Sequence, residues 1–473
     1  MPEPVPLPAP SAPPPPPARS RWGRRADALI IALVLGFAFL AGSFVARNSD
    51  VWLHLATGRA LVRGDYHLGT DPFAYTTDGR YWANHSWLFD LGLFAAFEGL
   101  GGPGVVALKA LAVAGTAGAM CFAARGRGPV WVTGACVLLA VLASSPRLLL
   151  QPAVGSALLL ALCLCCLRAG GRALVAVPAL IAVWVNLDAW FVLGPLLVGL
   201  FWLGRQFGPG RAAPPAWPRW FVPLCVGACL VSPHHVFALV LPMELSPAVW
   251  ASAFRTDPRF AGVFASPWHL APLGAAGGYN PAAWAFFGLL GLGAGSFAVN
   301  RRAVLGWRAA VWVPFALLAA WQARLIPFFA VVAGPITALN LHEVIPERAL
   351  ARAGRGLVLG GGAALLVLAW FGWATGFTNR DRAAAWGVHT DPTLARAAEG
   401  VPQWRATSGA ANARVLATHP DAGHYSAWFA PGERHFLDSR LHLFTHVASD
   451  YVAAARALGL LDAQPPGGGR PLA

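Results

Sequence analysis

The stretch Asn48–Asp90 reads NSDVWLHLATGRALVRGDYHLGTDPFAYTTDGRYWANHSWLFD and follows the first long apolar run of the chain, residues 28–46. Carboxylate, imidazole and guanidinium side chains alternate with tryptophans and tyrosines along it. Ionisable groups beside a membrane span are costly and usually functional. The pattern therefore favours a surface for a phosphorylated, lipid-linked or glycan substrate. The alternative is an interfacial loop whose aromatic side chains anchor it among lipid headgroups.

The composition is that of a multi-pass membrane protein. Hydrophobic residues make up 56% of the 473 residues and charged residues 12%, and several apolar runs reach the ~17–25 residues that cross a bilayer. Arginine carries nearly all of the net charge of +14, and Lys109 is the only lysine. Because the arginines cluster in short loops between apolar runs, they indicate membrane orientation and not nucleic-acid binding. The seven cysteines fall inside apolar runs and predict neither disulfides nor a metal site.

Eleven membrane spans are predicted, and the arginines orient them. If the short apolar segment Ser86–Leu100 lies on the outer surface, the arginine-rich short loops all face the cytoplasm. The N-terminus is then inside, the C-terminus is outside, and polar motifs from at least five loops meet on the outer face. The predicted spans are residues 28–46, 103–123, 129–145, 150–167, 173–188, 190–206, 219–232, 281–297, 306–322, 325–341 and 356–376.

Three regions are predicted along the chain. Residues 1–27 are a disordered, Pro-rich cytoplasmic tail, because such a composition cannot bury a core. Residues 28–376 are an all-α polytopic membrane domain with a first outer loop, 47–102, and a long outer loop, 233–280. The more polar residues 377–473, called the tail here, are expected to form a small α/β domain on the outer side.

Local patterns support this interpretation of the tail. Strand-like stretches are RVLAT at 414–418 and HFLDS at 435–439, and a helix-like stretch lies between them. Asp438 and Arg440 have opposite charges two residues apart. We expect them to form an ion pair inside the tail and not to act in catalysis.

The chain resembles the polytopic C-type glycosyltransferases (GT-C). In that class the first span leads into a large outer loop with two surface helices whose acidic residues form the active site. Asp50 stands where the class has its first acid, and DVWLHLATGRALVRGDYHLGTDPFAYT looks like the loop helix and the turn that leads to the second acid, matched by Asp71. Ser86–Leu100 fits the second surface helix.

More narrowly, the chain resembles a branch of large bacterial GT-C proteins of uncharacterised activity that carry a soluble tail. Their W-x-N-x-H-G, R-x-x-P-F-F-A and F-x-D-x-R elements are matched here by Trp184–Ala189, Arg324–Ala330 and Phe436–Arg440. Position 188 departs from the pattern, because Asp188 stands where the branch has histidine. A carboxylate there could still bind a sugar hydroxyl or a cation.

The resemblance implies transfer of a sugar from a polyprenyl-phosphate donor to an envelope glycan, lipid or protein, at the outer face of the bacterial cytoplasmic membrane. Such a reaction needs a base for the acceptor hydroxyl and positive groups for the departing phosphate. Asp50 is the candidate base, with Asp71 as second acid and His54 beside Asp50 on the same helix face. Helix capping by Asp50 and an Asx turn at Asp71 are the structural alternatives.

Further residues are candidates for binding the substrate or its phosphate. Guanidinium groups bind phosphate oxygens bidentately, although arginines at a span end can also snorkel to headgroups. If a Mg²⁺ or Mn²⁺ ion is needed, Asp50 and Asp71 would hold it. No nucleotide-binding motif is present, which suits a lipid-linked donor. The binding candidates are Arg324, Arg147, His85, Asn186, Asp188 and Arg59.

Two other functions stay open. One is a catalytically silent GT-C-like scaffold in envelope assembly, which the departure at Asp188 favours. The other is a transporter or flippase for a lipid-linked anion, but transporters often show inverted repeats and ionisable residues at mid-membrane, and here the polar motifs gather on one face. Membrane lipids and a lipid-linked donor are the expected partners. The sequence leaves the donor sugar, the acceptor and the oligomeric state open.

Overall fold

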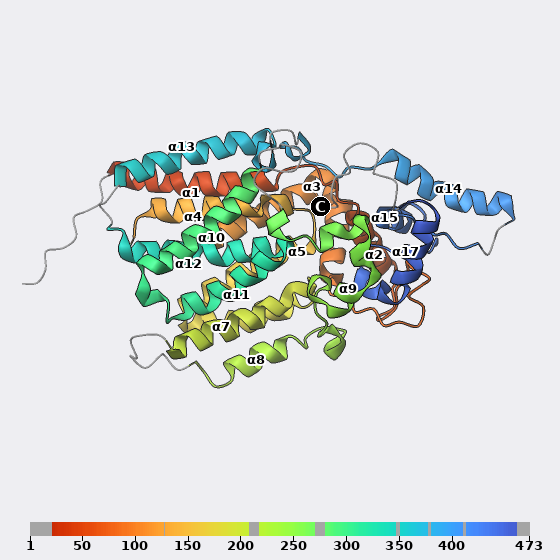
Figure 1. Cartoon of the computed structure of the whole chain (residues 1–473), viewed down its shortest axis with the longest axis horizontal. Coiled ribbons are helices and arrows are strands. Elements are labelled where there is room, and N and C mark those ends of the chain that lie inside the picture. Colours follow the sequence, from red (N-terminus) through yellow and green to blue (C-terminus); the bar gives the residue numbers. More distant parts are fainter. Residues whose placement is uncertain are drawn as a thin grey trace, which may run out of the picture.

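The computed structural model describes residues 21–126, 128–207, 217–269, 280–346, 351–376, 380–409 and 413–460. These residues are mostly helical. In Figure 1 the long helices lie side by side through one half of the molecule, while helices of the outer loops and the tail gather at the other end. Most of the predicted disordered segment 1–27 lies outside the described residues.

Eight helices, some extended by a short 3-10 turn, are long and apolar enough to cross a membrane among the described residues. Shorter apolar helices, α6 (Ala176–Trp184), α8 (Phe221–Ala228) and α11 (Trp307–Trp321), occupy the other three predicted spans. Every predicted span therefore contains a helix, while the total of eleven crossings stays a prediction. The eight are α1 (Arg21–Gly42), α3 (Trp87–Ala123), α4 (Val130–Ser144), α5 (Pro152–Ala169), α7 (Leu193–Phe207), α10 (Pro281–Val299), α12 (Ile326–Val344) and α13 (Ala351–Trp370).

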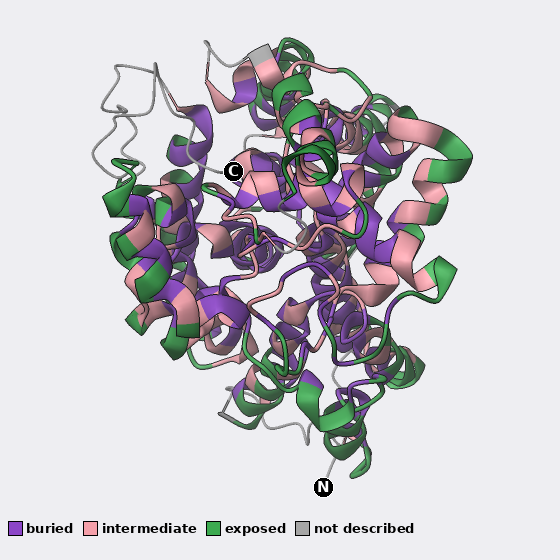
Figure 2. Ribbon diagram, turned by 90° about the vertical axis from the view of Figure 1, so that its right-hand side faces the viewer, coloured by how far each residue is buried: buried purple, intermediate pink, exposed green. Residues whose placement is uncertain are grey.

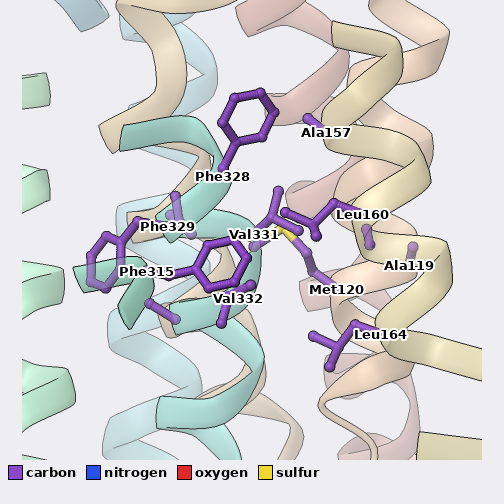
Figure 3. Close-up of a cluster of buried hydrophobic side chains, with 14 of the residues drawn as sticks. Ala119, Met120, Ala157, Leu160, Leu164, Phe315, Phe328, Phe329, Val331 and Val332 are labelled. Carbon is purple, nitrogen blue, oxygen red and sulfur yellow. The ribbon is translucent and has the colours of Figure 1, made fainter. Parts of the chain in front are cut away.

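Helix α12 lies at the centre of the bundle. It packs against α4, α10 and α11, and its residues from Ile326 to Asn340 are all buried. In Figure 3, Phe328 and Val331 of α12 face Met120 and Leu160 of the neighbouring helices. A helix that is apolar on all sides is expected in such a core position. Figure 2 shows the same division, with buried faces turned inward and exposed faces at the periphery.

The predicted surface helix Ser86–Leu100 is not a separate element. It forms the first part of α3, which continues into the predicted span 103–123 after a break at Gly101. Gly101 has φ 65° and ψ −171°, a conformation that is open almost only to glycine. The break lets the two parts of α3 run in different directions. A surface position for the first part therefore remains a prediction.

The outer loops and the tail are joined at one end of the molecule. Helix α2 (Asp50–Arg63) of the first outer loop packs between α3 and α15 (Pro420–Phe429) of the tail. Single bridges pair Phe44 with Ala384 and Ala46 with Val388, so the end of the first span is attached to the chain after the last one. The long outer loop consists of short turns and α9 (Pro247–Ala251) as far as residue 269.

The tail contains α14 (Pro392–Ser408), α15, α16 (Leu441–Phe444) and α17 (Ala448–Ala457). The two predicted strands do not form a sheet within its described residues. Val415 and Ala74 each make one isolated bridge to His435. The alternating pattern correctly indicates extended backbone, but the polar contacts of Asp438 and Arg440 turn the chain before a ladder can continue.

Candidate active site

A cavity of about 960 Å³ lies where the first outer loop, the outer ends of the spans and the tail meet. Five of the predicted site residues line it: Asp50, His54, His85, Asp188 and Arg324. They come from segments spread over nearly 300 positions of the sequence. The cavity lies at the upper end of the usual range for small-molecule sites, ~300–1,000 Å³, and has room for a sugar with its phosphate.

Asp50 is the first residue of α2. One carboxylate oxygen accepts a hydrogen bond from Asn48 Nδ2 at 2.6 Å, and the other accepts one from Gln151 Nε2 at 2.5 Å. Both donors are neutral amides, and no cation of the described residues pairs with the carboxylate. The positive end of the helix dipole favours the ionised form. Asp50 therefore presents an uncompensated negative charge to the cavity.

His54 pairs with Asp90 and does not contact Asp50 by a hydrogen bond. Its Nδ1 lies 2.6 Å from Asp90 Oδ1, and Asn84 Nδ2 donates to the other oxygen at 3.0 Å. Burial lowers the pKa of His54, but the Asp90 carboxylate beside it, helped by Asp50, raises the pKa above its ordinary value overall. His54 is thus held by Asp90 in the wall of the cavity, four residues after Asp50 on α2.

His85 and Asp188 are both largely removed from water. His85 Nε2 lies 2.7 Å from the Ala238 carbonyl oxygen, and burial lowers the pKa of its imidazole. Asp188 accepts a hydrogen bond of 2.6 Å from Ser156 Oγ, which itself accepts one from the indole of Trp184. Asp188 therefore lies at the wall of the cavity with one carboxyl oxygen held by Ser156.

Arg324 is already engaged inside the protein. Its Nη1 donates to Glu244 Oε1 at 3.0 Å, and its Nε donates to the Gly262 carbonyl at 3.3 Å. Arg147 interacts electrostatically with Arg324, but no hydrogen bond or ion pair holds its guanidinium within the part of the chain that the structure describes. The two predicted phosphate-binding arginines therefore differ, since Arg324 lines the cavity and pairs with Glu244, whereas Arg147 has no such partner and does not itself line the cavity.

Arg382, which the sequence analysis missed, belongs to the same group. It follows the last span, lines the cavity and interacts electrostatically with Arg147. Its Nη2 donates to the Pro146 carbonyl at 2.8 Å, and its Nη1 is buried with no hydrogen-bond partner among the described residues. Burial lowers its pKa to about 10. The acids near this arginine group are Glu244 and Asp381, and Asp381 also pairs with Arg47 at 3.6 Å.

The arginine group as a whole carries excess positive charge. Its four guanidinium groups, those of Arg47, Arg147, Arg324 and Arg382, lie near the two carboxylates of Glu244 and Asp381. The group therefore has about two excess positive charges, which suits a phosphate. A sequence signal for Arg382 does exist, because NRDR closely follows the last apolar run. No feature of the sequence distinguishes Arg382 from the other arginines of the chain.

Four predicted residues do not line the cavity. Arg147 is one of them, and the other three bind their segments to the surroundings. Asp71 accepts hydrogen bonds from Arg440 at 3.0 Å, from Thr77 Oγ1 and from the Phe73 N–H, so the Asx turn is present. Asn186 accepts the indole N–H of Trp87 at 2.8 Å. Arg59 donates to two carbonyls of the tail and lies over the Trp428 ring.

The structure does not bring Asp50 and Asp71 together as metal ligands. Asp50 faces the cavity with two amide donors, and Asp71 is buried beside Arg440. Among the described residues, no group of three or more His, Cys, Asp or Glu is placed to hold a metal ion. The residues present therefore do not fit the predicted Mg²⁺ or Mn²⁺ site.

No protein-family model and no curated protein matches this sequence. Solved structures of the oligosaccharyltransferase from the archaeon Archaeoglobus fulgidus do match its fold. The complex of that enzyme, AglB, with an inhibitory peptide and a dolichol-phosphate superimposes with a TM-score of 0.56 at 11% identity, over 89% of this chain and 64% of that one. Its structure with a tethered acceptor peptide gives 0.53 at 12% identity, over 88% and 64%.

The chain shares the fold of the archaeal oligosaccharyltransferase. This supports the prediction of a multi-pass, mostly helical fold like that of the C-type glycosyltransferases, and the likeness at such low identity shows the fold alone. The chain spans 64% of the length of the archaeal enzyme. Membership of the narrower bacterial branch stays a prediction.

Proposed function

We propose that this GT-C protein is a membrane glycosyltransferase that moves a sugar from a polyprenyl-phosphate donor to an acceptor hydroxyl at the outer face of the bacterial cytoplasmic membrane. The observation that carries the proposal is the charge pattern of the cavity. Asp50, whose carboxylate has no cation partner among the described residues, lines one cavity with Arg324 and Arg382, and Arg147 interacts electrostatically with both arginines. The archaeal enzyme with this fold was solved with a dolichol-phosphate and a peptide bound.

Each part of the cavity suits one part of the reaction. The acceptor oxygen forms a bond to the anomeric carbon, and the bond from that carbon to the phosphate oxygen breaks with its electron pair going to the phosphate. Arg382 stabilises that developing charge, and the nearby charge of Arg147 adds to its field, since preorganised cations act most strongly where water is excluded. Asp50 supplies negative charge beside the acceptor hydroxyl and the sugar ring, as the base or as a counter-charge.

The test is a deletion strain whose lipid extracts and envelope glycans are compared with the parent by mass spectrometry. We expect one glycolipid or glycan to lose a sugar, and the wild-type gene to restore it. Asp50→Asn should fail to restore it, whereas Glu98→Gln, an exposed acid on α3, should restore it fully. Full restoration by Asp50→Asn would favour the silent scaffold. An accumulated, fully glycosylated lipid on the inner face would favour the transporter.

Membrane orientation is tested separately. All seven cysteines are free thiols, so single cysteines can be placed in a variant that lacks them. We expect a cysteine at Gly99 to react with an impermeant reagent in intact cells, and one at Arg172 to react only after permeabilisation. Both positions are exposed, so differences in labelling would not result from burial. Labelling of Arg172 but not Gly99 in intact cells would place the cavity on the cytoplasmic side.

A further inference from the structure

Four polar side chains form a chain of hydrogen bonds between the first outer loop and the tail, along the wall of the cavity. His424 of α15 lies between two serines, with Nδ1 2.9 Å from Ser49 Oγ and Nε2 2.9 Å from Ser439 Oγ. Ser49 Oγ donates in turn to Asp421 Oδ1 at 2.6 Å. All four residues line the cavity. None of them was a candidate in the sequence analysis.

The hydrogen-bond roles follow from the acid at one end. A carboxylate only accepts, so the single proton of Ser49 points at Asp421. Ser49 Oγ must then accept from His424, which places the imidazole proton on Nδ1. The other nitrogen, Nε2, keeps its lone pair and accepts from the Ser439 hydroxyl, and the Ser439 N–H also points at it at 3.3 Å. Nε2 of His424 is therefore placed to take a proton from the Ser439 hydroxyl, which lines the cavity.

The surroundings of His424 suit a group that gains a proton for a short time. The side chain is only 2% exposed, and burial lowers the pKa of its imidazole, which keeps it neutral at rest. Three carboxylates act on it, those of Asp438, Asp421 and Asp50, while His435 opposes them. Asp438 is itself neutralised by Arg440. The remaining acids would stabilise an imidazolium once it forms.

We propose that Ser439 and His424 receive the proton that the acceptor hydroxyl loses during sugar transfer, so that the tail supplies the base of the active site. This rests on the proposed function. As the acceptor oxygen bonds to the anomeric carbon, its proton passes to Ser439 Oγ while the Ser439 proton passes to His424 Nε2. The electron pair of the broken bond leaves with the lipid phosphate. The imidazolium later returns its proton to solvent through the same hydroxyl.

This division of labour gives Asp50 the role of counter-charge. Imidazole is the side chain most often used as a general base, and His424 accepts a hydrogen bond from a hydroxyl that lines the cavity. Asp50 also has both oxygens engaged by amide donors. The negative charge of Asp50 then stabilises the positive charge that develops on the sugar ring, while Ser439 and His424 of the tail receive the proton of the acceptor hydroxyl.

The test compares Ser439→Ala, Ser439→Thr and His424→Gln in the deletion strain. The rate at which the missing product reappears after induction is measured by mass spectrometry. Threonine keeps the hydroxyl and alanine does not, so we expect Ser439→Ala and His424→Gln to slow reappearance ~100-fold and Ser439→Thr to stay within about fivefold. Ser449→Ala, an exposed serine on α17, is the matched control and should be normal.

A second measurement needs no substrate. In the ¹⁵N-histidine-labelled full chain, one imidazole at pH 7 should show a proton on Nδ1 and none on Nε2, and this signal should vanish in His424→Gln. A proton on Nε2, or a normal rate in Ser439→Ala, would refute the relay. If Asp50→Asn is inactive while Ser439→Ala is normal, the relay alone fails. If both are normal, the glycosyltransferase proposal fails as well. Should His424→Gln not fold, the Ser439 pair decides.

Discussion

Asp50 and Asp71 lie 21 positions apart in one outer loop, yet they have opposite surroundings. Asp50 faces the cavity, and its hydrogen bonds come from two neutral amides. The side chain of Asp71 is fully buried and paired with Arg440 of the tail, which also pairs with Asp438. The charge of Asp50 is therefore available to a ligand, whereas the charge of Asp71 is neutralised by Arg440 and stabilises the junction of loop and tail.

The difference shows how one kind of side chain serves chemistry or architecture according to its partner. A buried carboxylate with a guanidinium partner becomes costly when the partner is removed. A carboxylate that receives only neutral hydrogen bonds at a cavity wall can lose its charge at little cost to stability. Variants of the two regions should therefore fail in different ways, in stability at the loop–tail junction and in turnover at the cavity.

The largest effect is expected from Arg440→Gln. The change leaves the carboxylates of Asp71 and Asp438 buried without their cation, and breaking a buried ion pair costs about 3–5 kcal/mol. We expect a lower melting temperature and rapid proteolysis of the tail. Arg396→Gln, at an exposed arginine on α14, is the control and should melt like the wild type. Normal melting of Arg440→Gln would show that the junction does not depend on this pair.

The same junction predicts a dependence on pH. Burial raises the pKa of Asp438, but Arg440 and His435 lower it more, so it lies well below its ordinary value. A depressed pKa in the folded state adds stability above the unfolded value, near pH 4, and that stability is lost as the pH falls through the folded value. The tail should therefore resist proteolysis from pH 7 to about pH 4 and open below. Opening between pH 7 and 5 would contradict this.

Asp50→Asn should give the next largest effect, and on turnover. Loss of the negative charge is expected to lower the rate ~100-fold or more, about 2.7 kcal/mol, with an unchanged melting temperature. Asp71→Asn should show the opposite pattern, with ~1–3 kcal/mol lost in stability and near-normal turnover in the folded fraction. If both variants changed melting temperature and turnover to the same extent, the two acids would not differ in role.

Lysine variants of the arginine group should also differ in turnover, according to whether the arginine already has a carboxylate partner. Arg382→Lys and Arg147→Lys lose the bidentate fork, and one hydrogen bond to a charged group is worth ~1.5–3 kcal/mol, so we expect a ~10- to 100-fold loss of turnover. Arg324→Lys can still pair with Glu244 and should cost less than about threefold. The readout is product formation in the deletion strain. A larger loss in Arg324→Lys would make that residue the phosphate ligand.

The smallest effect is expected at Gly101, in the helix that carries Asp90. A side chain at φ 65° costs ~1–2 kcal/mol, and the space around Gly101 is otherwise open, so Gly101→Ala should lower the melting temperature slightly. Gly99→Ala, two residues earlier in ordinary helix, should be neutral or stabilising. Equal melting of the two variants would mean that the break in α3 can straighten.

Most of the fold could be predicted because its signal is local. Apolar runs of the right length produced a helix at each of the eleven predicted positions. Residues from Asn48–Asp90 and from the described part of the long loop, 233–269, line the same cavity. The ion pair of Asp438 with Arg440 was also correct, since its members are two residues apart. The strands of the tail were not, because a ladder needs a partner segment that no local pattern specifies.

The sequence by itself determined that the chain is helical, has several segments that can cross a membrane and carries its polar motifs near the ends of these segments. Hydropathy and charge of neighbouring residues suffice for this, because transfer into lipid is a property of each segment alone. Only the tertiary structure decided which acids and arginines are free. The partner of Asp71 lies 369 positions along the chain, that of Asp50 lies 101, and His424 meets Ser49 across 375. Charge compensation depends on such distant contacts, so the division between structural and chemical residues appears only after folding.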